Sequence, residues 1–550
     1  MLSPKLLLVL AALLAGNVVN ALWPLPRSIT TGPTGLVLSP DFKIEVKGPY
    51  PSDLQPAVAR TLSYIRNDKH ERLVVGRGSV DTTAIKSAKQ LRSLVVTSKG
   101  SETIATEARA PLGTRDEAYV LNIPSDGSPA TLSANSTLGL FRGLTTFSQV
   151  WYTHDSSIYT VEAPISISDS PAFPYRGFML DTARNYFSVD VIKRQLDAMS
   201  WVKQNTFHWH IVDSQSFPLV VPGYEAISSK GAYSSEEIYT PSQIADIVRY
   251  ANERGIDVIA EIDTPGHTSA ISKSFPEHIA CPEASPWTTY ANEPPAGQLR
   301  LASSDTIKFT TGLLVNAAKL FPGNYFSTGG DEINAKCYAD DPKTQEALAA
   351  SGKTFEQALD VFTQAEHRAL KDTGKTAVVW QEMVLSHQVT LANDTVIMVW
   401  ISSADAAAVV QKGFRIVHAP SDYFYLDCGG GGWVGDFPTG NSWCDPFKTW
   451  QKAYSFNPYT NISESQRHLV LGGQQLLWTE QSSPNNIDPI VWPRAAASAE
   501  VFWSGPGGNG QAALARLHDH AYRITQRGIR AIALQPKWCA LRPGKCDLKA

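Results

Sequence analysis

No excess of charge of either sign marks this sequence, and long runs of like charge are missing. Its 48 lysines and arginines nearly balance 52 aspartates and glutamates, for a net charge of −4. Proteins that bind nucleic acid carry a basic surface for its phosphates, so nucleic acid is not an expected partner. Aromatic residues, in contrast, are plentiful. The 14 tryptophans and 19 tyrosines offer rings that can stack on sugars, although most large aromatics are core residues.

Long hydrophobic runs are absent beyond the N-terminus. There, Lys5 precedes an apolar run over 6–14, and Val19-Asn20-Ala21 offers small residues for cleavage. This run is too short for a bilayer, which takes about 20 residues, and the order is typical of a secretory signal peptide. We predict a signal peptide over 1–21, no membrane anchor, and a secreted, extracellular product. A buried N-terminal helix is the alternative structure, and a lysosome- or vacuole-like compartment is the alternative location.

Cysteine is scarce, and the six cysteines form no C-x-x-C pair. Disulfides are therefore favoured over a metal site, and no metal or cofactor is expected. Several pairings are open, and the simplest is sequential: Cys281–Cys337, Cys428–Cys444 and Cys539–Cys546. Three N-x-S/T sequons, which predict glycosylation and agree with secretion, begin at Asn135, Asn393 and Asn461.

The chain divides into two parts with different patterns. Residues 22–170 show strand-like alternation at 91–97 and 118–123 and a helical pattern at 136–151, which predicts a small α+β domain. A turn-rich stretch at 168–174 follows. Over 171–550, short apolar strands alternate with amphipathic helices, a pattern typical of a parallel sheet.

Eight strands are predicted in the second part. They are 177–181, 206–212, 257–263, 325–330, 377–380, 396–400, 415–418 and 470–478. One intervening helix has Thr240 as N-cap and Pro241 at its first position, and another follows Ser188. Eight strand–helix alternations predict a fold of class α/β, a (β/α)8 TIM barrel with long loops and a C-terminal extension. A doubly wound open sheet is the alternative.

Acids, histidines and aromatic residues follow these strands. In a barrel, the C-terminal ends of the strands meet on one face, where active sites lie. The residues at these ends are Asp181, Arg184, His208, His210, Asp213, Asp263, His267, Asp331, Glu332, Trp380, Glu382, Trp400, Tyr425, Asp427, Trp478 and Glu480. Such a set suits a sugar, because carboxylates and arginine bind hydroxyls while indoles pack against ring carbons.

Asp331 and Glu332 are the candidates for acid catalysis. Glycoside cleavage needs a protonated acid at the leaving oxygen and a group that stabilises the oxocarbenium-like centre. Burial and the charge of Asp331 are expected to raise the pKa of Glu332, so that it keeps its proton. Adjacent side chains on a strand point to opposite sides, so the pair is poorly placed as acid and nucleophile on one bond. The nucleophile is then expected elsewhere, for example in the substrate.

These motifs resemble those of glycoside hydrolase family 20, the β-N-acetylhexosaminidases, and look most like its secreted fungal members. The matching strings are 175–177 (YRG), 181–184 (DTAR), 208–213 (HWHIVD), 263–267 (DTPGH), 329–332 (GGDE), 380–382 (WQE), 425–427 (YLD) and 478–480 (WTE). They cover about 175–500 in the family's order. Residues 22–170 resemble the family's smaller N-terminal domain, and the propeptide that secreted fungal members can carry would fall there.

The resemblance implies an exo-acting, retaining enzyme without cofactor that removes terminal N-acetylglucosamine or N-acetylgalactosamine from chitooligosaccharides or glycoconjugates. The 2-acetamido group of the substrate would be the nucleophile. Glu332 would be the general acid and base, Asp331 would hold the acetamido N–H, and Tyr425 would bind its oxygen. The remaining roles fall into three sets: Asp213 and His267 as a relay behind Glu332; Trp380, Trp400 and Trp478 as walls; Arg176, Asp427 and Glu480 as hydroxyl ligands. A homodimer is implied too.

Two alternatives remain open at this stage. His208-x-His210 on a barrel strand could bind zinc in a metal-dependent amidohydrolase. A sugar-binding protein that retains the barrel is the non-catalytic alternative, although it would be expected to lose the Asp-Glu pair.

The sequence also departs from animal relatives, with Ser214 in place of a second aspartate and Cys428 in place of an arginine that serves sulfated sugars. Special activity on 6-sulfated sugars is therefore not expected.

Overall fold

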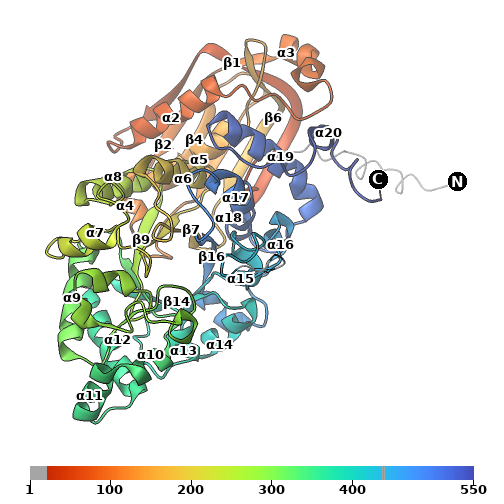
Figure 1. The fold of residues 1–550 in the computed structure, drawn as a ribbon. Helices are drawn as coiled ribbons and strands as arrows, with labels where there is room; N and C mark the ends of the chain where they lie inside the picture. The colour runs from red at the N-terminus through yellow and green to blue at the C-terminus, as the bar shows by residue number, and fades with distance from the viewer. Residues whose placement is uncertain (1–20, 436–437, 439, 550) are drawn as a thin grey trace.

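The computed structural model describes residues 21–435, 438 and 440–549, which form an N-terminal sheet domain and a closed barrel (Figure 1). Apart from Ala21, the predicted signal peptide lies outside these residues. Within the described part of the chain, no helix is both long and apolar enough to cross a membrane.

The N-terminal domain is a six-stranded sheet with helices packed on it. Its strand order is β1-β2-β4-β3-β6-β5. The bounds are β1 Ser28–Lys47, β2 Lys89–Ser98, β3 Tyr119–Ile123, β4 Ala130–Ala134, β5 Tyr152–His154 and β6 Ser157–Asp169. Helices α2 (Leu54–Asn67) and α5 (Thr137–Gln149) pack together, and every residue of α5 is buried. The predicted strands and helix of this α+β unit are thus present.

The second part is a closed barrel of eight parallel strands, as predicted. Its order around the barrel is β12-β13-β14-β15-β16-β7-β8-β9. The bounds are β7 Tyr175–Asp181, β8 Thr206–Val212, β9 Asp257–Ile262, β12 Tyr325–Gly329, β13 Thr376–Trp380, β14 Val396–Val399, β15 Arg415–His418 and β16 Val470–Leu477. Every residue of β7, β8, β9 and β16 is buried, because helices cover the outside while side chains fill the interior.

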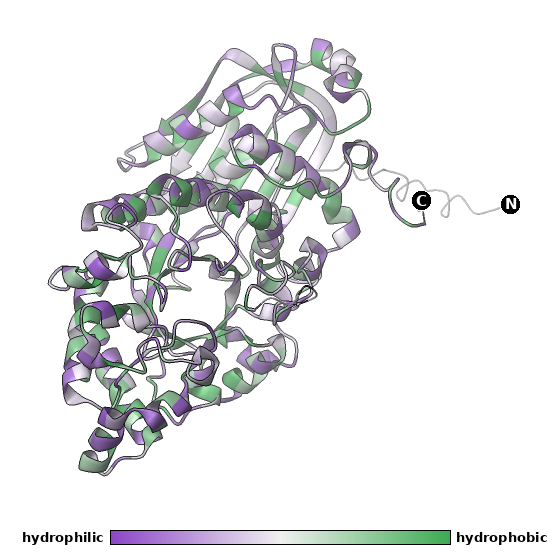
Figure 2. Ribbon diagram, in the orientation of Figure 1, coloured by the Kyte–Doolittle hydropathy of each residue, from purple (hydrophilic) through white to green (hydrophobic). Residues whose placement is uncertain are grey.

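Helices between the strands follow their capping signals. Helix α8 (Pro241–Asn252) begins at Thr240, whose side chain forms a capping box with Gln243. Helix α6 (Val189–Trp201) follows Ser188, which makes no side-chain cap bond. In Figure 2 the outer helices carry bands of hydrophilic and hydrophobic residues, as expected for helices with one buried face.

The C-terminal extension returns to the N-terminal domain. After helix α18 (Arg494–Ser504), helix α19 (Gly510–Gln526) lies beside that domain in Figure 1. Arg516 of α19 pairs with Glu500 of α18 and donates to the Leu22 carbonyl, and Arg527 pairs with Asp68. The extension therefore connects the two parts of the molecule.

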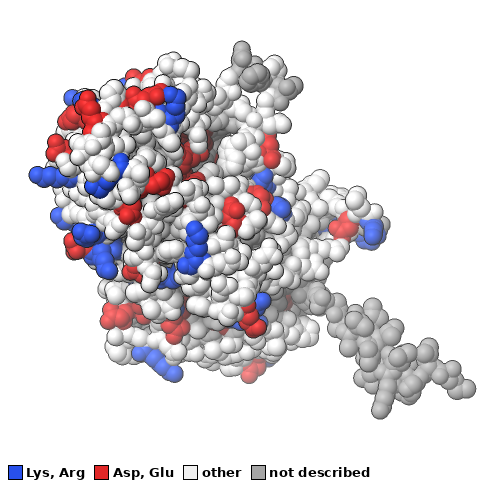
Figure 3. Space-filling model, turned by 90° about the horizontal axis from the view of Figure 1, so that it is seen from below, with Lys and Arg blue, Asp and Glu red and all other residues white. Residues whose placement is uncertain are grey.

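All three disulfides follow the sequential pairing: Cys281–Cys337, Cys428–Cys444 and Cys539–Cys546. The sequon residues Asn135, Asn393 and Asn461 are exposed, so each is accessible to a glycan. On the face drawn in Figure 3, basic side chains are interspersed with acidic ones.

Candidate active site

A cavity of about 550 Å³ opens at the C-terminal ends of the barrel strands. Among the residues proposed for the site, those on its wall are His267, Asp331, Glu332, Trp400, Tyr425, Asp427, Trp478 and Glu480. The barrel thus brings together side chains that lie up to 297 positions apart in the sequence, from Arg184 to Gln481.

Asp331 and Glu332 both face this cavity because the chain bends sharply after β12. The backbone at Gly329, Gly330 and Glu332 has positive φ angles of 64°, 97° and 52°. A Cβ atom at Gly329 would lie 2.0 Å from Asp263 Oδ1, so only glycine fits there. The alternation expected of a strand therefore ends at Gly329, and the two acids lie side by side on the cavity wall.

A buried relay lies behind Glu332. His267 Nε2 is 3.4 Å from Glu332 Oε2, and His267 Nδ1 is 3.0 Å from Asp213 Oδ1. Arg184 Nη1, at 2.8 Å, and His210 Nε2, at 2.7 Å, contact the other Asp213 oxygen. Burial lowers the pKa of His267, but the charges of Asp213 and Asp331 outweigh it and raise that pKa well above its ordinary value.

The pKa values of the two acids differ from the expectation. Burial raises the pKa of Glu332, but the hydrogen bond and charge of His267 outweigh it, so this pKa lies below its usual value. Burial instead raises the pKa of Asp331, and the charge of Glu332 adds to the effect. The expected rise in the pKa of Glu332 from its neighbour is therefore wrong, because the imidazolium of His267 is the stronger influence.

One oxygen of Asp331 accepts no hydrogen bond within the described residues, although His267 Nε2 forms an ion pair with it at 3.9 Å. This oxygen, Oδ1, is buried. Asp263 lies close by, and burial and the charge of Asp331 raise the pKa of Asp263 well above its usual value. Since a buried acceptor without a hydrogen bond is costly, this oxygen is suited to accept a hydrogen bond from a substrate.

The two histidines of β8 are not free to bind a metal. His208 Nε2 contacts Glu261 at 2.9 Å, and its Nδ1 contacts Gln474 at 3.0 Å. His210 Nδ1 contacts Glu261 at 2.6 Å, and its Nε2 contacts Asp213 at 2.7 Å. Burial lowers the pKa of His210, but hydrogen bonds to Asp213 and Glu261 raise it to about 9, so the ring carries a proton on each nitrogen at neutral pH. The zinc alternative loses its support.

Aromatic side chains form one side of the cavity. Trp400 stacks on Tyr425 with ring centroids 6.2 Å apart and planes 12° apart, and Trp478 lies 6.3 Å from Tyr425. Tyr425 is fixed by pairing with Leu476 of β16. Trp380 is buried and does not belong to the residues that line the cavity. It packs against Trp478 at 6.2 Å and so supports the wall from behind.

Arg176 is not a hydroxyl ligand, and this prediction is wrong. The residue lies near the N-terminal end of β7, at the opposite end of the barrel from the cavity, and is fully buried. Its guanidinium pairs with Glu117 of the N-terminal domain at 2.5 Å. Arg184, which follows the C-terminal end of β7, lines the cavity instead. The position of each arginine relative to the strand is the signal that distinguishes them.

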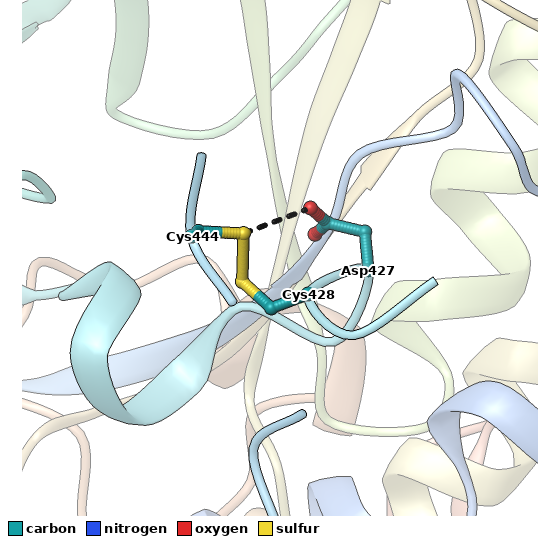
Figure 4. Close-up of side chains that lie close together, drawn as sticks. All are labelled: Asp427, Cys428 and Cys444. Atoms are coloured by element: carbon teal, nitrogen blue, oxygen red, sulfur yellow. Dashed lines mark hydrogen bonds between the residues drawn. A yellow bond between two sulfur atoms is a disulfide. The ribbon is translucent and has the colours of Figure 1, made fainter. Parts of the chain in front are cut away.

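Asp427 and Glu480 are partly buried acids on the same wall. Burial raises the pKa of Asp427 to about 7 and raises that of Glu480 well above its usual value. Cys444 Sγ lies 3.8 Å from Asp427 Oδ2 (Figure 4). Because both cysteines near Asp427 are joined in the Cys428–Cys444 disulfide, they hold the loop in place and are not metal ligands.

Several cavity residues were not predicted. They are Trp287, Asn292, Glu293, Trp433, Trp443 and Gln481. Most lie in irregular loops after strands, where no periodic pattern points toward a site. The Cys281–Cys337 and Cys428–Cys444 disulfides anchor two of these loops. The cysteines were therefore the one feature of the sequence that could have indicated that these loops are ordered.

Comparisons with known proteins identify the family of this chain. A family model described as "Glycosyl hydrolase family 20, catalytic domain" matches residues 173–506, and one described as "beta-acetyl hexosaminidase like" matches 22–150. A "Beta-hexosaminidase" of Arthroderma benhamiae is 37% identical over 458 residues, which cover 79% of this chain and 74% of that protein. A "Chitooligosaccharidolytic beta-N-acetylglucosaminidase" of Ostrinia furnacalis is 36% identical over 450 residues, covering 78% and 75%. The solved chitobiase of Flavobacterium johnsoniae superposes with a TM-score of 0.75 at 27% identity, over 92% of this chain and 73% of that one.

Proposed function

The chain belongs to glycosyl hydrolase family 20, and we propose that it is a retaining, exo-acting β-N-acetylhexosaminidase. It removes terminal N-acetylglucosamine or N-acetylgalactosamine from chitooligosaccharides or glycoconjugates. The observation that carries the proposal is the pair Asp331 and Glu332, turned together into an aromatic cavity with the His267–Asp213 relay behind it. A non-catalytic sugar-binding protein would have no need for this relay.

In the first step, the acetamido oxygen of the bound sugar attacks its anomeric carbon. The new C–O bond closes an oxazolinium ring while the glycosidic C–O bond breaks, and Glu332 gives its proton to the leaving oxygen. In the second step, Glu332 takes a proton from water, which attacks the same carbon and reopens the ring. Two inversions give net retention, and Glu332 ends in its starting protonation state.

Asp331 and Tyr425 position the acetamido group in this scheme. Asp331 Oδ1, which accepts no hydrogen bond from the described residues, accepts the acetamido N–H, and its negative charge stabilises the positive charge that develops as the ring closes. Tyr425, on the same wall, donates to the acetamido oxygen. Trp400 and Trp478 enclose the group, with Trp380 behind Trp478.

Arg184, Asp427 and Glu480 bind the hydroxyls of the sugar ring. Arg184 is held by Asp213 and Glu293, so its guanidinium is fixed before substrate arrives. Asp427 and Glu480, whose pKa values are raised by burial, can donate as well as accept while they are protonated. Such pre-organised polar groups favour one orientation of the sugar.

The proposal is tested with matched aryl β-glycosides that carry either a 2-acetamido or a 2-hydroxyl group. The acetamido substrate should have the higher kcat/KM by at least about 10³-fold, because an intramolecular nucleophile replaces an intermolecular one. Equal rates on the two substrates would refute substrate assistance. Turnover of neither, with sugar binding intact, would favour the binding-protein alternative.

Secretion and self-association complete the proposal. The three disulfides and three exposed sequons support an extracellular, glycosylated product. The homodimer implied by the family stays a prediction.

A further inference from the structure

Glu382 is a buried acid that the proposed mechanism does not use. It follows β13 as the first residue of the short helix α13 (Glu382–Leu385) and is only 8% exposed. The Trp400 indole Nε1 lies 3.0 and 2.9 Å from its two carboxyl oxygens, so the ring N–H donates to this side chain. Burial, aided by the charge of Asp331, raises the pKa of Glu382 to about 8, which leaves the acid neutral at neutral pH.

The preceding residue holds the backbone of the same tryptophan. Gln381 Oε1 accepts from the backbone N–H of Trp400 at 2.8 Å and from that of Ile401 at 3.1 Å. Gln381 Nε2 in turn donates to Asp405 at 2.8 Å. Two consecutive residues after β13 therefore fix Trp400, one through its main chain and the other through its ring.

The orientation of the Trp400 ring matters for the shape of the cavity. The ring is nearly parallel to Tyr425, and Trp443 meets it edge-on at 5.6 Å and 84°. Trp400 lines the cavity together with Asp331 and Tyr425, the two groups assigned to the acetamido substituent. Rotation of the ring about its side-chain bonds would change the space beside these two groups. The hydrogen bond from the indole N–H to Glu382 opposes such rotation.

We propose that Glu382 is a positioning residue that fixes the plane of the Trp400 ring and thereby limits the length of the N-acyl group that the cavity accepts. The inference rests on the proposed function, because it concerns the acyl pocket of that same site. A fixed tryptophan ring excludes N-acyl groups that carry additional methylenes, whereas a mobile ring would move aside and accept them.

Glu382→Met tests the inference, because methionine fills a similar volume but offers no acceptor of comparable strength. The substrates are aryl β-glycosides of glucosamine with N-acetyl and N-butanoyl groups. The wild-type protein should prefer the acetyl substrate by about tenfold or more in kcat/KM, as expected for added methylenes in a tight pocket. Glu382→Met should narrow this preference by at least about fivefold. A folded variant with the wild-type ratio would overturn the inference.

Three further variants separate positioning from a general effect of mutation. Glu382→Gln retains an oxygen that can accept from the indole, so it should recover most of the acyl-length preference, and failure to recover it counts against the inference. Trp400→Phe removes the hydrogen-bond donor, so adding Glu382→Met to it should have little further effect on the ratio of kcat/KM for the acetyl and butanoyl substrates. Additive effects of the two substitutions would contradict the coupling between Glu382 and Trp400. Glu162 on β6 is equally buried at 8%, and Glu162→Met should leave the ratio at its wild-type value.

The outcomes also separate this inference from the proposed function. If the wild-type protein fails to cleave the N-acetyl substrate, the proposed function fails. If it cleaves that substrate but Glu382→Met leaves the preference for acyl length unaltered, only the role of Glu382 fails.

Discussion

At the scale of single residues, the environment of Glu332 determines its chemistry. His267 lies between Glu332 and Asp213 and lowers the pKa of Glu332, so this acid is ionised at neutral pH. General acid catalysis needs the protonated form, which becomes more abundant as pH falls. Turnover should therefore be favoured on the acidic side of neutrality, and a bound sugar, by excluding water, would favour the neutral acid further.

Glu332→Gln should preserve the fold and sugar binding while removing the proton donor. For an alkyl or sugar leaving group, kcat/KM should fall by about 10²- to 10⁴-fold, the usual value of general acid catalysis. For a dinitrophenyl leaving group, which departs without protonation, the loss in kcat/KM should be much smaller. Steady-state kinetics on both substrate types measures this contrast, and an equal loss on both would argue against the acid role.

At the scale of secondary-structure elements, hydrogen bonds between residues at the C-terminal ends of the strands hold these ends together around the cavity. Asp181 at the end of β7 accepts from the Thr479 backbone N–H at 3.1 Å and from its hydroxyl at 2.9 Å, just beyond β16. Its other oxygen accepts from the backbone N–H of Ala183 at 2.8 Å. One carboxylate thus connects the first and last strands of the barrel and positions the neighbours of Thr479, which are Trp478 and Glu480.

Thr479→Val should weaken the link between these strand ends, because it removes the hydroxyl bond to Asp181 and keeps the backbone bond. Loss of a hydrogen bond to a buried carboxylate should lower the free energy of unfolding by about 1–3 kcal/mol. KM should rise more than kcat falls, because the sugar contacts proposed for Trp478 and Glu480 would be made in both the ground and transition states. Denaturant unfolding and steady-state kinetics provide the two measurements. Thr479→Ser, which keeps the hydroxyl, is the matched control, and equal effects of the two variants would contradict the role of the hydroxyl.

At the scale of the whole molecule, a buried ion cluster joins the N-terminal domain to the end of the barrel where the strands begin. Glu117 contacts Arg176 of β7 at 2.5 Å and Arg142 of α5 at 2.7 Å, and Arg142 also donates to the Gly255 carbonyl. Burial raises the pKa of Glu117, but the charges of Arg176 and Arg142 outweigh it and lower that pKa to about 2. Arg176 therefore has an architectural role.

Glu117→Gln should destabilise the protein in a pH-dependent way. At neutral pH, the loss should be about 3–5 kcal/mol, since two buried arginines lose their partner. Because the folded pKa is depressed, the stabilisation is present above the unfolded pKa, near 4.5, and is lost as pH falls toward 2. The difference in unfolding free energy between wild type and variant should shrink over this window. A difference that stays constant from pH 7 to pH 3 would exclude the charge as its source.

Much of the fold and site could be predicted because their signals are local. The eight apolar strands, the Thr240 cap and the Asp331–Glu332 pair each depend on neighbouring residues only. The loops that carry Glu293 and Trp443 could not be predicted, because irregular segments lack periodicity and are placed by disulfides and long-range contacts. Arg176 was misassigned because its role was inferred from a motif, whereas its position at the start of the strand, opposite to that of Arg184, would have excluded it.

The sequence alone determined which residues form strands and helices, which are buried and which chemical groups are available, because hydrophobic periodicity and capping act over a few residues. Only the tertiary structure decided which of these groups share a cavity and which protonation states they prefer. Closure of the barrel brings Asp213, His267 and Glu332 into one relay and leaves Arg176 at the far end. Burial and electrostatic interactions depend on distance in space, which the order of residues along the chain does not give.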